Sequence, residues 1–301
     1  MPYNNIKKDR RNFLKLAVSM SLLSASPAWA IDLFKIIDPE GKSKDLNKAR
    51  KILQGTGNIL ASSTEIDYKS EYTIGESLAL QGVKQYGLPV KNSSLQKYVN
   101  LVGNAVAGNS IRPSIPYHFI VVDSQIYNAF ACPGGIIFIS SILVKSMEDE
   151  SQLAGVLAHE VSHVGHKHAL SSIRRAKFFE GVGNITEAAM KGDKGKDFQN
   201  MIGTLETTLF DKGLDQTMEY EADLSAMEAA YKTGYDPQGF VKVLEMLQLR
   251  EKSSSKKGSW FSTHPPLFSR ISKCSTKMSA YPDASAMARV ADRFTGYRKL
   301  L

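Results

Sequence analysis

The stretch His159-Glu160-Val161-Ser162-His163 decides how this chain is interpreted. The two histidines are four residues apart, so on a helix both imidazoles lie on one face and can reach a single ion. Glu160 directly follows the first histidine and is placed to take a proton from a water on that ion. The preceding residues 153–158 are Leu-Ala-Gly-Val-Leu-Ala, which indicates a buried helix rather than an exposed one with chance histidines. The motif predicts a catalytic centre with one Zn²⁺ per chain.

A catalytic zinc needs a third protein ligand and an open position for water. His166 and His168 follow the motif, and position 169, where a third histidine of the metzincin pattern would stand, is Ala. A helix that continues through these residues directs both histidines away from the metal. We therefore expect structural roles for them and look for the third ligand elsewhere.

Residues 219–223, Glu-Tyr-Glu-Ala-Asp, are the best source of that ligand. Glu219 and Asp223 are four apart on a predicted helix whose shared face carries small alanines, which let two helices approach closely. One of the two carboxylates can bind zinc while the other orients a ligand histidine. Glu221 projects to a different side and is expected to be solvated.

The pattern elsewhere changes from helix to strand and back to helix. Residues 31–113 are mainly helical in pattern, and Asn92-Ser93-Ser94 offers an N-cap for a helix there. Residues 117–123 and 129–142 are rich in β-branched and aromatic side chains, and the turn residues Cys132-Pro-Gly-Gly135 make the second run a hairpin.

Two long helices are predicted after the hairpin. The first runs from Ser146, as a capping residue, to about residue 179. The second covers about residues 216–231 and ends at Gly234 as a left-handed cap. Residues 181–216, between them, contain clusters of Gly, Lys and Asp and are predicted to form a mobile loop.

The first thirty residues have the pattern of an export signal. A basic start with Arg10-Arg11 in the string Arg-Arg-Asn-Phe-Leu-Lys leads into a short apolar stretch and then into Ala28-Trp29-Ala30. The string resembles a twin-arginine signal, so we expect a periplasmic protein cleaved after Ala30. The apolar stretch is too short to cross a bilayer, and no stable membrane insertion is expected.

Composition excludes other classes of protein. The formal net charge is +8, but the basic residues form no stripe with interleaved aromatic side chains, so nucleic acid is not an expected partner. Cys132 and Cys274 are the two cysteines. They lack metal-ligand spacing and are either one disulfide or two buried thiols.

Six ordered motifs resemble the CaaX prenyl protease/HtpX-like zinc peptidases and, among them, their soluble BepA-like periplasmic branch. The resemblance covers roughly residues 70–275 and rests on Asn128-Ala-Phe130, Pro133-Gly-Gly135, His159-Glu-x-x-His163, Glu219-x-Glu-Ala-Asp223, Gly234-Tyr-Asp-Pro237 and Ser262-Thr-His-Pro-Pro266 with Arg270.

The resemblance implies a role for each matching residue. Glu219 would be the third zinc ligand, and Asp223 would orient a ligand histidine. The strand that holds Asn128, Ala129, Phe130 and Ala131 would pair with an extended substrate. The membrane helices of the prenyl proteases and the tetratricopeptide tail of the periplasmic branch have no counterpart in the sequence, so prenylated substrates and docking in outer-membrane assembly are not implied.

His264 and Arg270 are further catalytic candidates that the resemblance places over the zinc. In an open state both could hydrogen-bond the developing oxyanion. In a closed state His264 could take the fourth zinc position and block entry. We expect the closed, self-inhibited arrangement as the resting state.

These observations together predict an α+β fold, a zincin-like (gluzincin) metallopeptidase domain that is mostly helical with a small β-sheet beside the active-site helix. The predicted function is a zinc metalloendopeptidase of the cell envelope that acts on unfolded or misassembled envelope proteins, while the oligomeric state is left open. The alternatives are a zinc-containing chaperone with little turnover and a hydrolase of small peptides or amides. Predicted segments are an export signal (1–30), an N-terminal helical segment (31–70), the metallopeptidase domain (71–275) and a helical tail (276–301).

Overall fold

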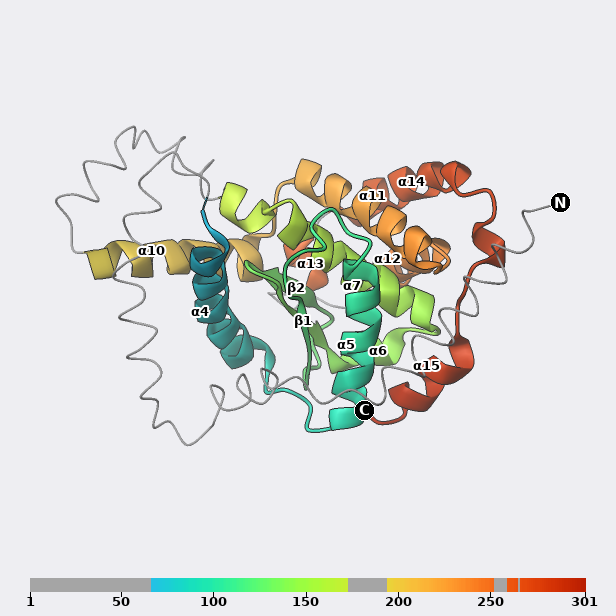
Figure 1. Cartoon of the computed structure of the whole chain (residues 1–301), viewed down its shortest axis with the longest axis horizontal. Helices are drawn as coiled ribbons and strands as arrows, with labels where there is room; N and C mark the ends of the chain where they lie inside the picture. The colour runs from blue at the N-terminus through green and yellow to red at the C-terminus, as the bar shows by residue number, and fades with distance from the viewer. Residues whose placement is uncertain (1–65, 173–193, 252–258, 265) are drawn as a thin grey trace.

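A computed structural model describes residues 66–172, 194–251, 259–264 and 266–301. The predicted export signal and most of the predicted N-terminal helical segment lie outside the described residues, and the four predicted domain boundaries stay a prediction. Helices enclose a three-stranded sheet (Figure 1). The helices are α4 (Tyr68–Tyr86), α5 (Ser93–Ala107), α6 (Ser141–Ser146), α7 (Glu150–Gly165), α10 (Lys194–Thr207), α11 (Gln216–Thr233), α12 (Gln238–Glu251), α13 (Trp260–Thr263), α14 (Leu267–Lys277) and α15 (Ala291–Arg298), with a π-helical turn at Thr208–Lys212 and 3₁₀ turns at Met278–Ala280 and Ala284–Ala286.

The sheet contains β1 (His118–Val122), β2 (Ala129–Cys132) and β3 (Ile136–Ser140) in the order β1-β3-β2. β3 is parallel to β1 and antiparallel to β2, so the predicted hairpin is confirmed, and within the described part of the chain β2 is an edge strand. Its turn requires glycine at Gly134 and Gly135, whose φ angles are +79° and +101°. A Cβ at Gly134 would also lie 2.6 Å from the Tyr72 Cα.

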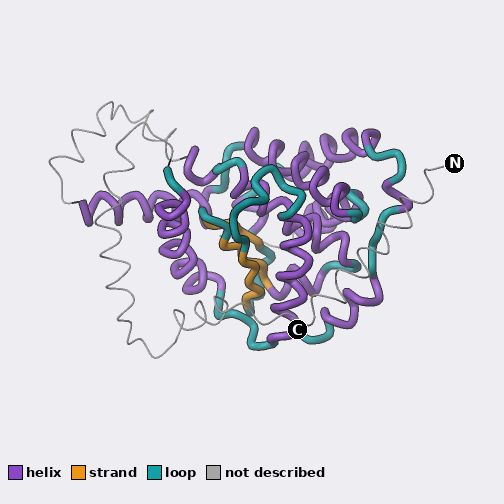
Figure 2. The backbone as a smooth tube through the Cα atoms, in the orientation of Figure 1, coloured by secondary structure: helices purple, strands orange, loops and turns teal. Residues whose placement is uncertain are grey.

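Every residue of the three strands is buried because helices cover both faces of the sheet (Figure 2). Alternate strand residues face two separate hydrophobic cores. Phe119 and Ala131 belong to the core that includes α5, α7, α11 and α12, whereas Phe130 and Phe138 belong to the core beside α4 and the π-helical turn. Continuous apolar runs such as residues 119–122 are typical of strands covered on both faces.

Helix α7 is the central element, and the sequence misplaced both of its ends. It begins after Asp149, whose side chain accepts a hydrogen bond from the Gln152 amide, while Ser146 ends the separate helix α6. It ends at Gly165 rather than near residue 179. Lys167 then has a left-handed φ of 56°, and residues 168–172 are again helical. This left-handed residue breaks the helix, which hydrophobic spacing alone does not reveal.

Helix α11 packs against α7 as its alanines predict. Ala222, Ala226 and Ala230 are all fully buried, and Ala226 and Ala230 belong to the core that also contains α7. The helix ends at Gly234, which has a φ of 102° and donates its amide to the Ala230 carbonyl, so the predicted cap is confirmed. These small side chains bring the backbone of α11 close enough for its carboxylates to reach the histidines of α7.

The loop predicted over residues 181–216 is wrong for the part that the structure describes. Residues 194–212 form α10 and the π-helical turn. Leu205 and Phe210 are fully buried in the core beside α4. Glycine and charged residues at the start of this segment obscured its apolar spacing.

Cys132 and Cys274 are free and buried in different hydrophobic cores. Of the two alternatives left open by the sequence, the structure has two buried thiols. Among the described residues no helix is long and apolar enough to cross a membrane.

Candidate metal centre

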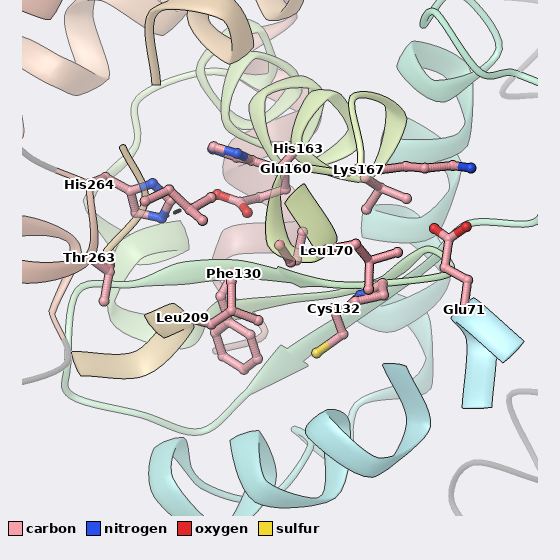
Figure 3. A pocket seen from close by; sticks show the side chains of 15 residues that line it. Glu71, Phe130, Cys132, Glu160, His163, Lys167, Leu170, Leu209, Thr263 and His264 are labelled. Atoms are coloured by element: carbon pink, nitrogen blue, oxygen red, sulfur yellow. Dashed lines mark ion pairs between the residues drawn. The ribbon is translucent and has the colours of Figure 1, made fainter. Parts of the chain in front are cut away.

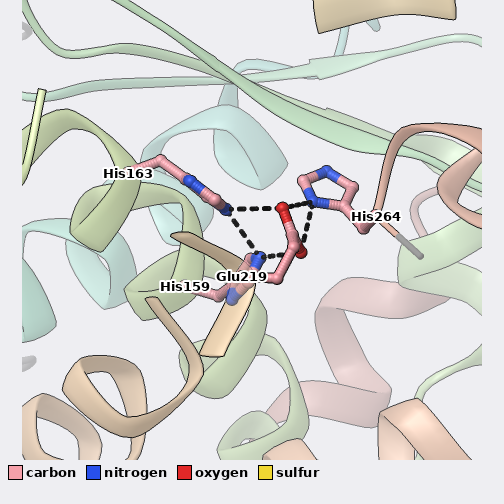
Figure 4. Close-up of side chains that lie close together, drawn as sticks. All are labelled: His159, His163, Glu219 and His264. Atoms are coloured by element: carbon pink, nitrogen blue, oxygen red, sulfur yellow. Dashed lines mark hydrogen bonds and ion pairs between the residues drawn. The ribbon is translucent and has the colours of Figure 1, made fainter. Parts of the chain in front are cut away.

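Helices α7 and α11 bring His159, His163 and Glu219 together (Figure 4). The two histidine Nε2 atoms are 3.0 Å apart. The carboxylate of Glu219 lies 3.7 Å from the Nε2 of His159 and 3.5 Å from that of His163. Burial lowers the pKa of His159 to about 4, so this imidazole is neutral at physiological pH and its lone pair is available to a metal.

Glu160 points from the same helix into a pocket beside these three residues (Figure 3). Its side chain is fully buried, and neither of its carboxylate oxygens has a hydrogen-bond partner among the described residues. Burial raises the pKa of Glu160 to about 7, although the nearby charge of His264 opposes this shift. A carboxylate with this pKa can both accept and return a proton near neutral pH.

Asp223 lies behind the histidines, one turn along α11 from Glu219. Its Oδ1 is 3.0 Å from the Nδ1 of His159, on the side of the ring opposite Glu219. Burial alone would raise the pKa of Asp223, but the charge and hydrogen bonds of Arg270, together with the adjacent imidazole of His159, lower it to about 2. A permanently ionised carboxylate in this position fixes the tautomer and orientation of a ligand histidine.

Arg270 is fully buried and engages two acidic residues of α11, Asp223 and Glu219. It donates to the two oxygens of Asp223 over 2.8 and 2.7 Å, and its Nη1 lies 2.9 Å from Glu219 Oε2 and 2.8 Å from the carbonyl of His264. All three guanidinium nitrogens are thus engaged. This geometry favours a role in positioning, and the contact of Arg270 with an oxyanion stays a prediction.

His264 joins the group at the end of α13. Its Nδ1 is 3.1 Å from each oxygen of Glu219, and its ring stacks on Trp260 with centroids 4.4 Å apart. Its Nε2 lies 3.4 Å from the carbonyl of Ala129 and 3.9 Å from Glu160. His264 therefore lies between Glu160 of α7 and the strand β2.

The predicted substrate strand borders the same pocket. Ala131 and Phe130 line it, while the Asn128 side chain lies 3.4 Å from the hydroxyl of Thr263. The remaining wall of the pocket includes three leucines that the sequence did not single out, Leu170, Leu209 and Leu214. Leu170 follows the break after α7, whereas Leu209 and Leu214 lie just before α11, in the segment where the sequence pattern was least informative.

His168 and Glu221 are two further residues at the site that sequence reasoning did not connect with it. The Nδ1 atoms of His168 and His163 are 2.9 Å apart, and the Nε2 of His168 lies 3.1 Å from Glu221. Neither belongs to the group around Glu219. The break in α7 after Gly165 explains the contact, because it turns His168 back onto the outer nitrogen of His163.

The donor set fits a single divalent metal. Two neutral imidazoles and a carboxylate are the protein ligands of many catalytic zinc sites, and the buried, unpartnered Glu160 lies where it could meet a water or substrate. With the α+β fold, this arrangement defines a metallopeptidase of the zincin class. Residues 93–277 match the family described as peptidase family M48, and the chain belongs to that family.

Curated relatives agree with this assignment. The chain is 28% identical to the beta-barrel assembly-enhancing protease of Yersinia pestis over 83% of this chain and 52% of that protein. It is 30% identical to the protein of the same name from Escherichia coli (strain K12), over 60% of this chain and 38% of that protein. Bovine mitochondrial metalloendopeptidase OMA1 is 29% identical over 48% of this chain and 29% of its own length. The chain spans about half or less of the length of these relatives.

Proposed function

We propose that this protein is a zinc-dependent endopeptidase of the bacterial cell envelope. The observation that carries the proposal is the position of Glu160, buried without a hydrogen-bond partner among the described residues and adjacent to His159, His163 and Glu219. A binding protein needs no such carboxylate, because a buried acid without a hydrogen-bond partner is costly unless chemistry uses it. This argument favours an enzyme over a zinc-containing chaperone with little turnover.

His159, His163 and Glu219 would hold the zinc, which supplies a Lewis acid for the scissile carbonyl and lowers the pKa of the attacking water. Glu160 takes the proton from that water and passes it to the leaving amine. Asp223 keeps the Nδ1 of His159 protonated, so that its Nε2 faces the ion. Arg270 holds the carboxylates of Asp223 and Glu219 in place through its ion pairs with both.

The substrate would bind in an extended form along β2. Among the described residues this strand has a sheet partner on one side only, and its residues Phe130 and Ala131 line the pocket beside Glu160. An edge strand accepts any extended backbone, and the apolar pocket next to it accepts a hydrophobic side chain. Such features suit unfolded chains more than small amides, which require a closed pocket.

Unfolded or misassembled envelope proteins are the substrates that we propose. Two observations support this choice: the export-signal pattern in the first thirty residues, and the similarity to relatives named beta-barrel assembly-enhancing protease. Periplasmic location through a twin-arginine signal is part of the same proposal. Protein quality control is the process in which this activity would be used.

His264 would regulate entry in the resting enzyme. As a fourth ligand it would exclude both water and substrate, and its distance of 3.4 Å from the Ala129 carbonyl also covers a group that a substrate strand would use. In the working enzyme it would move aside and could donate to the oxyanion.

The variant Glu160→Gln tests the proposed reaction. It removes the base while it keeps the side-chain volume, so it should bind one equivalent of zinc and lose cleavage of an unfolded protein such as casein by at least about 10². In cells, the variant should accumulate exported proteins that the wild type removes. Casein cleavage at the wild-type rate would refute the mechanism, and normal clearance of exported proteins by the variant would favour the chaperone.

A further inference from the structure

A second group of metal-ligand atoms lies beside the centre described above. His166 Nδ1 is 3.2 Å from one oxygen of Glu221, and His168 Nε2 is 3.1 Å from the other. These ligand atoms all lie within 4.8 Å of one another. The rings of His166 and His168 stack nearly parallel, with an interplanar angle of 10°. We call these three residues the outer cluster.

The break at the end of α7 creates the outer cluster. His166 follows the last residue of the helix, and Lys167 has a left-handed φ of 56°. The reversed backbone turns the two histidines on either side of Lys167 toward α11. Glu221 is two residues from Glu219 on that helix, so it faces a different side from the ligands of the catalytic centre.

We propose that the outer cluster is a second divalent-cation site, weaker than the catalytic one and inhibitory when filled. Two imidazoles and a carboxylate favour zinc among the common biological cations. The side chains of His166 and Glu221 are 19% and 55% exposed, so an ion can enter from solvent and keep water ligands.

Ser225 prepares His166 for this role. Its hydroxyl lies 2.9 Å from the Nε2 of His166, on the opposite side of the ring from Glu221. With a cation on Nδ1, the proton of His166 resides on Nε2 and is donated to the serine oxygen. A ligand histidine whose other nitrogen donates to a fixed acceptor is the usual arrangement in protein metal sites.

The hydrogen bond between His163 and His168 links the two sites, because only one of the two rings can donate it. When the catalytic metal occupies Nε2 of His163, the proton of this neutral ring is on Nδ1 and is donated to Nδ1 of His168 over 2.9 Å. The proton of His168 is then on Nε2, where it is donated to Glu221. The lone pair that a second cation needs is therefore in use.

A cation on Nε2 of His168 reverses this arrangement. The proton of His168 moves to Nδ1 and meets the proton on Nδ1 of His163, so one ring must rotate out of place. Filling the outer cluster therefore loosens His163 and weakens the catalytic centre. Because linkage is reciprocal, the catalytic metal also weakens the outer site, which accounts for its lower affinity and for inhibition only when the cation is in excess.

Metal counting tests the site without requiring cleavage. In a Glu160→Gln background, metal-free protein titrated with Zn²⁺ should bind a tight equivalent and a second, weaker one. His166→Ala should weaken the second equivalent by about tenfold or more, because one of three ligands is lost, and should leave the first unchanged. The matched control is Glu228→Gln, a change at a 44% exposed side chain on α11, the helix that carries Glu221. It should retain both equivalents of Zn²⁺. A single equivalent in the unsubstituted background, or a second one unaffected by His166→Ala, would overturn the site.

Inhibition tests the coupling. Casein cleavage by the protein with Glu160 intact should fall as Zn²⁺ exceeds one equivalent, and His166→Ala should move this inhibition to about tenfold higher Zn²⁺. Inhibition at the same concentration in both proteins would place its cause at the catalytic centre and overturn the coupling. If neither protein cleaves casein, the proposed function fails, whereas the metal counts still decide whether the second site exists.

Discussion

The catalytic centre and the outer cluster contain the same chemical groups in different surroundings. Each combines two imidazoles with a carboxylate from α11. In the catalytic centre, His159 and Glu219 are fully buried, and Glu160 lies beside them without a hydrogen-bond partner among the described residues. In the outer cluster the carboxylate of Glu221 is more than half exposed. Ligand type alone therefore does not define a catalytic site. Burial and an adjacent base distinguish the catalytic centre from the outer cluster.

The supports behind the two clusters also differ in strength. His159 is held by Asp223, which is itself held by the fully buried Arg270. His166 is held by the single hydroxyl of Ser225. A buried ion pair makes the catalytic geometry costly to disturb, whereas one neutral hydrogen bond contributes only about 1 kcal/mol.

The matched pair Glu219→Gln and Glu221→Gln should separate the clusters most sharply. Glu219→Gln replaces a charged ligand by an amide, so we expect zinc affinity at the catalytic centre to fall by about a hundredfold or more and cleavage to become undetectable. For the catalytic centre, Glu221→Gln removes only the hydrogen-bond acceptor of His168. The zinc affinity of that centre should therefore fall by about tenfold or less. Metal content after dialysis against graded chelator measures both. Equal losses would show that the two carboxylates are not distinguished as the geometry suggests.

Asp223→Ala should be the next largest change. It leaves the charge of Arg270 buried with Glu219 as its remaining acidic partner, so we expect a loss of about 3–5 kcal/mol in the free energy of unfolding. Ser225→Ala, the counterpart behind the outer cluster, should cost about 1 kcal/mol. Urea unfolding of the metal-free proteins compares them.

Asp223→Asn is the second variant, because Asp223→Ala could fail to fold. It keeps the shape of the side chain and should still lower zinc affinity about tenfold to a hundredfold. Wild-type affinity in Asp223→Asn would contradict the positioning role.

Much of the fold was predictable from local pattern. The hairpin follows from β-branched runs around Gly134 and Gly135, and the close packing of α7 and α11 follows from alanines such as Ala226. These signals lie within a few residues of one another, and each has one dominant physical cause. The grouping of His159, His163 and Glu219 follows from helical spacing and from the resemblance to a peptidase family, and the roles of these residues remain to be measured.

The features that the sequence did not predict depend on tertiary contacts or on a single backbone angle. The end of α7 depends on Lys167, whose left-handed φ is unusual for a residue with a side chain and carries no sequence signal. Because the break was not predicted, the contact of His168 with His163 could not be predicted either. The guanidinium of Arg270 could likewise be assigned to a substrate or to a carboxylate until the position of Asp223 was known.

His264→Ala should give the smallest effect and the one with the most informative sign. In the structure His264 contacts Glu219 and lies between Glu160 and the carbonyl of Ala129, which are the groups that water and substrate would approach. Removing the ring should therefore raise casein cleavage by a factor of about ten or less, with zinc content kept at one equivalent. His166→Ala, measured at one equivalent of zinc, is the comparison from the outer cluster and should leave the rate unchanged. A loss of about 10²–10³ in kcat for His264→Ala with zinc retained would instead assign His264 to the oxyanion, and self-inhibition would then be wrong.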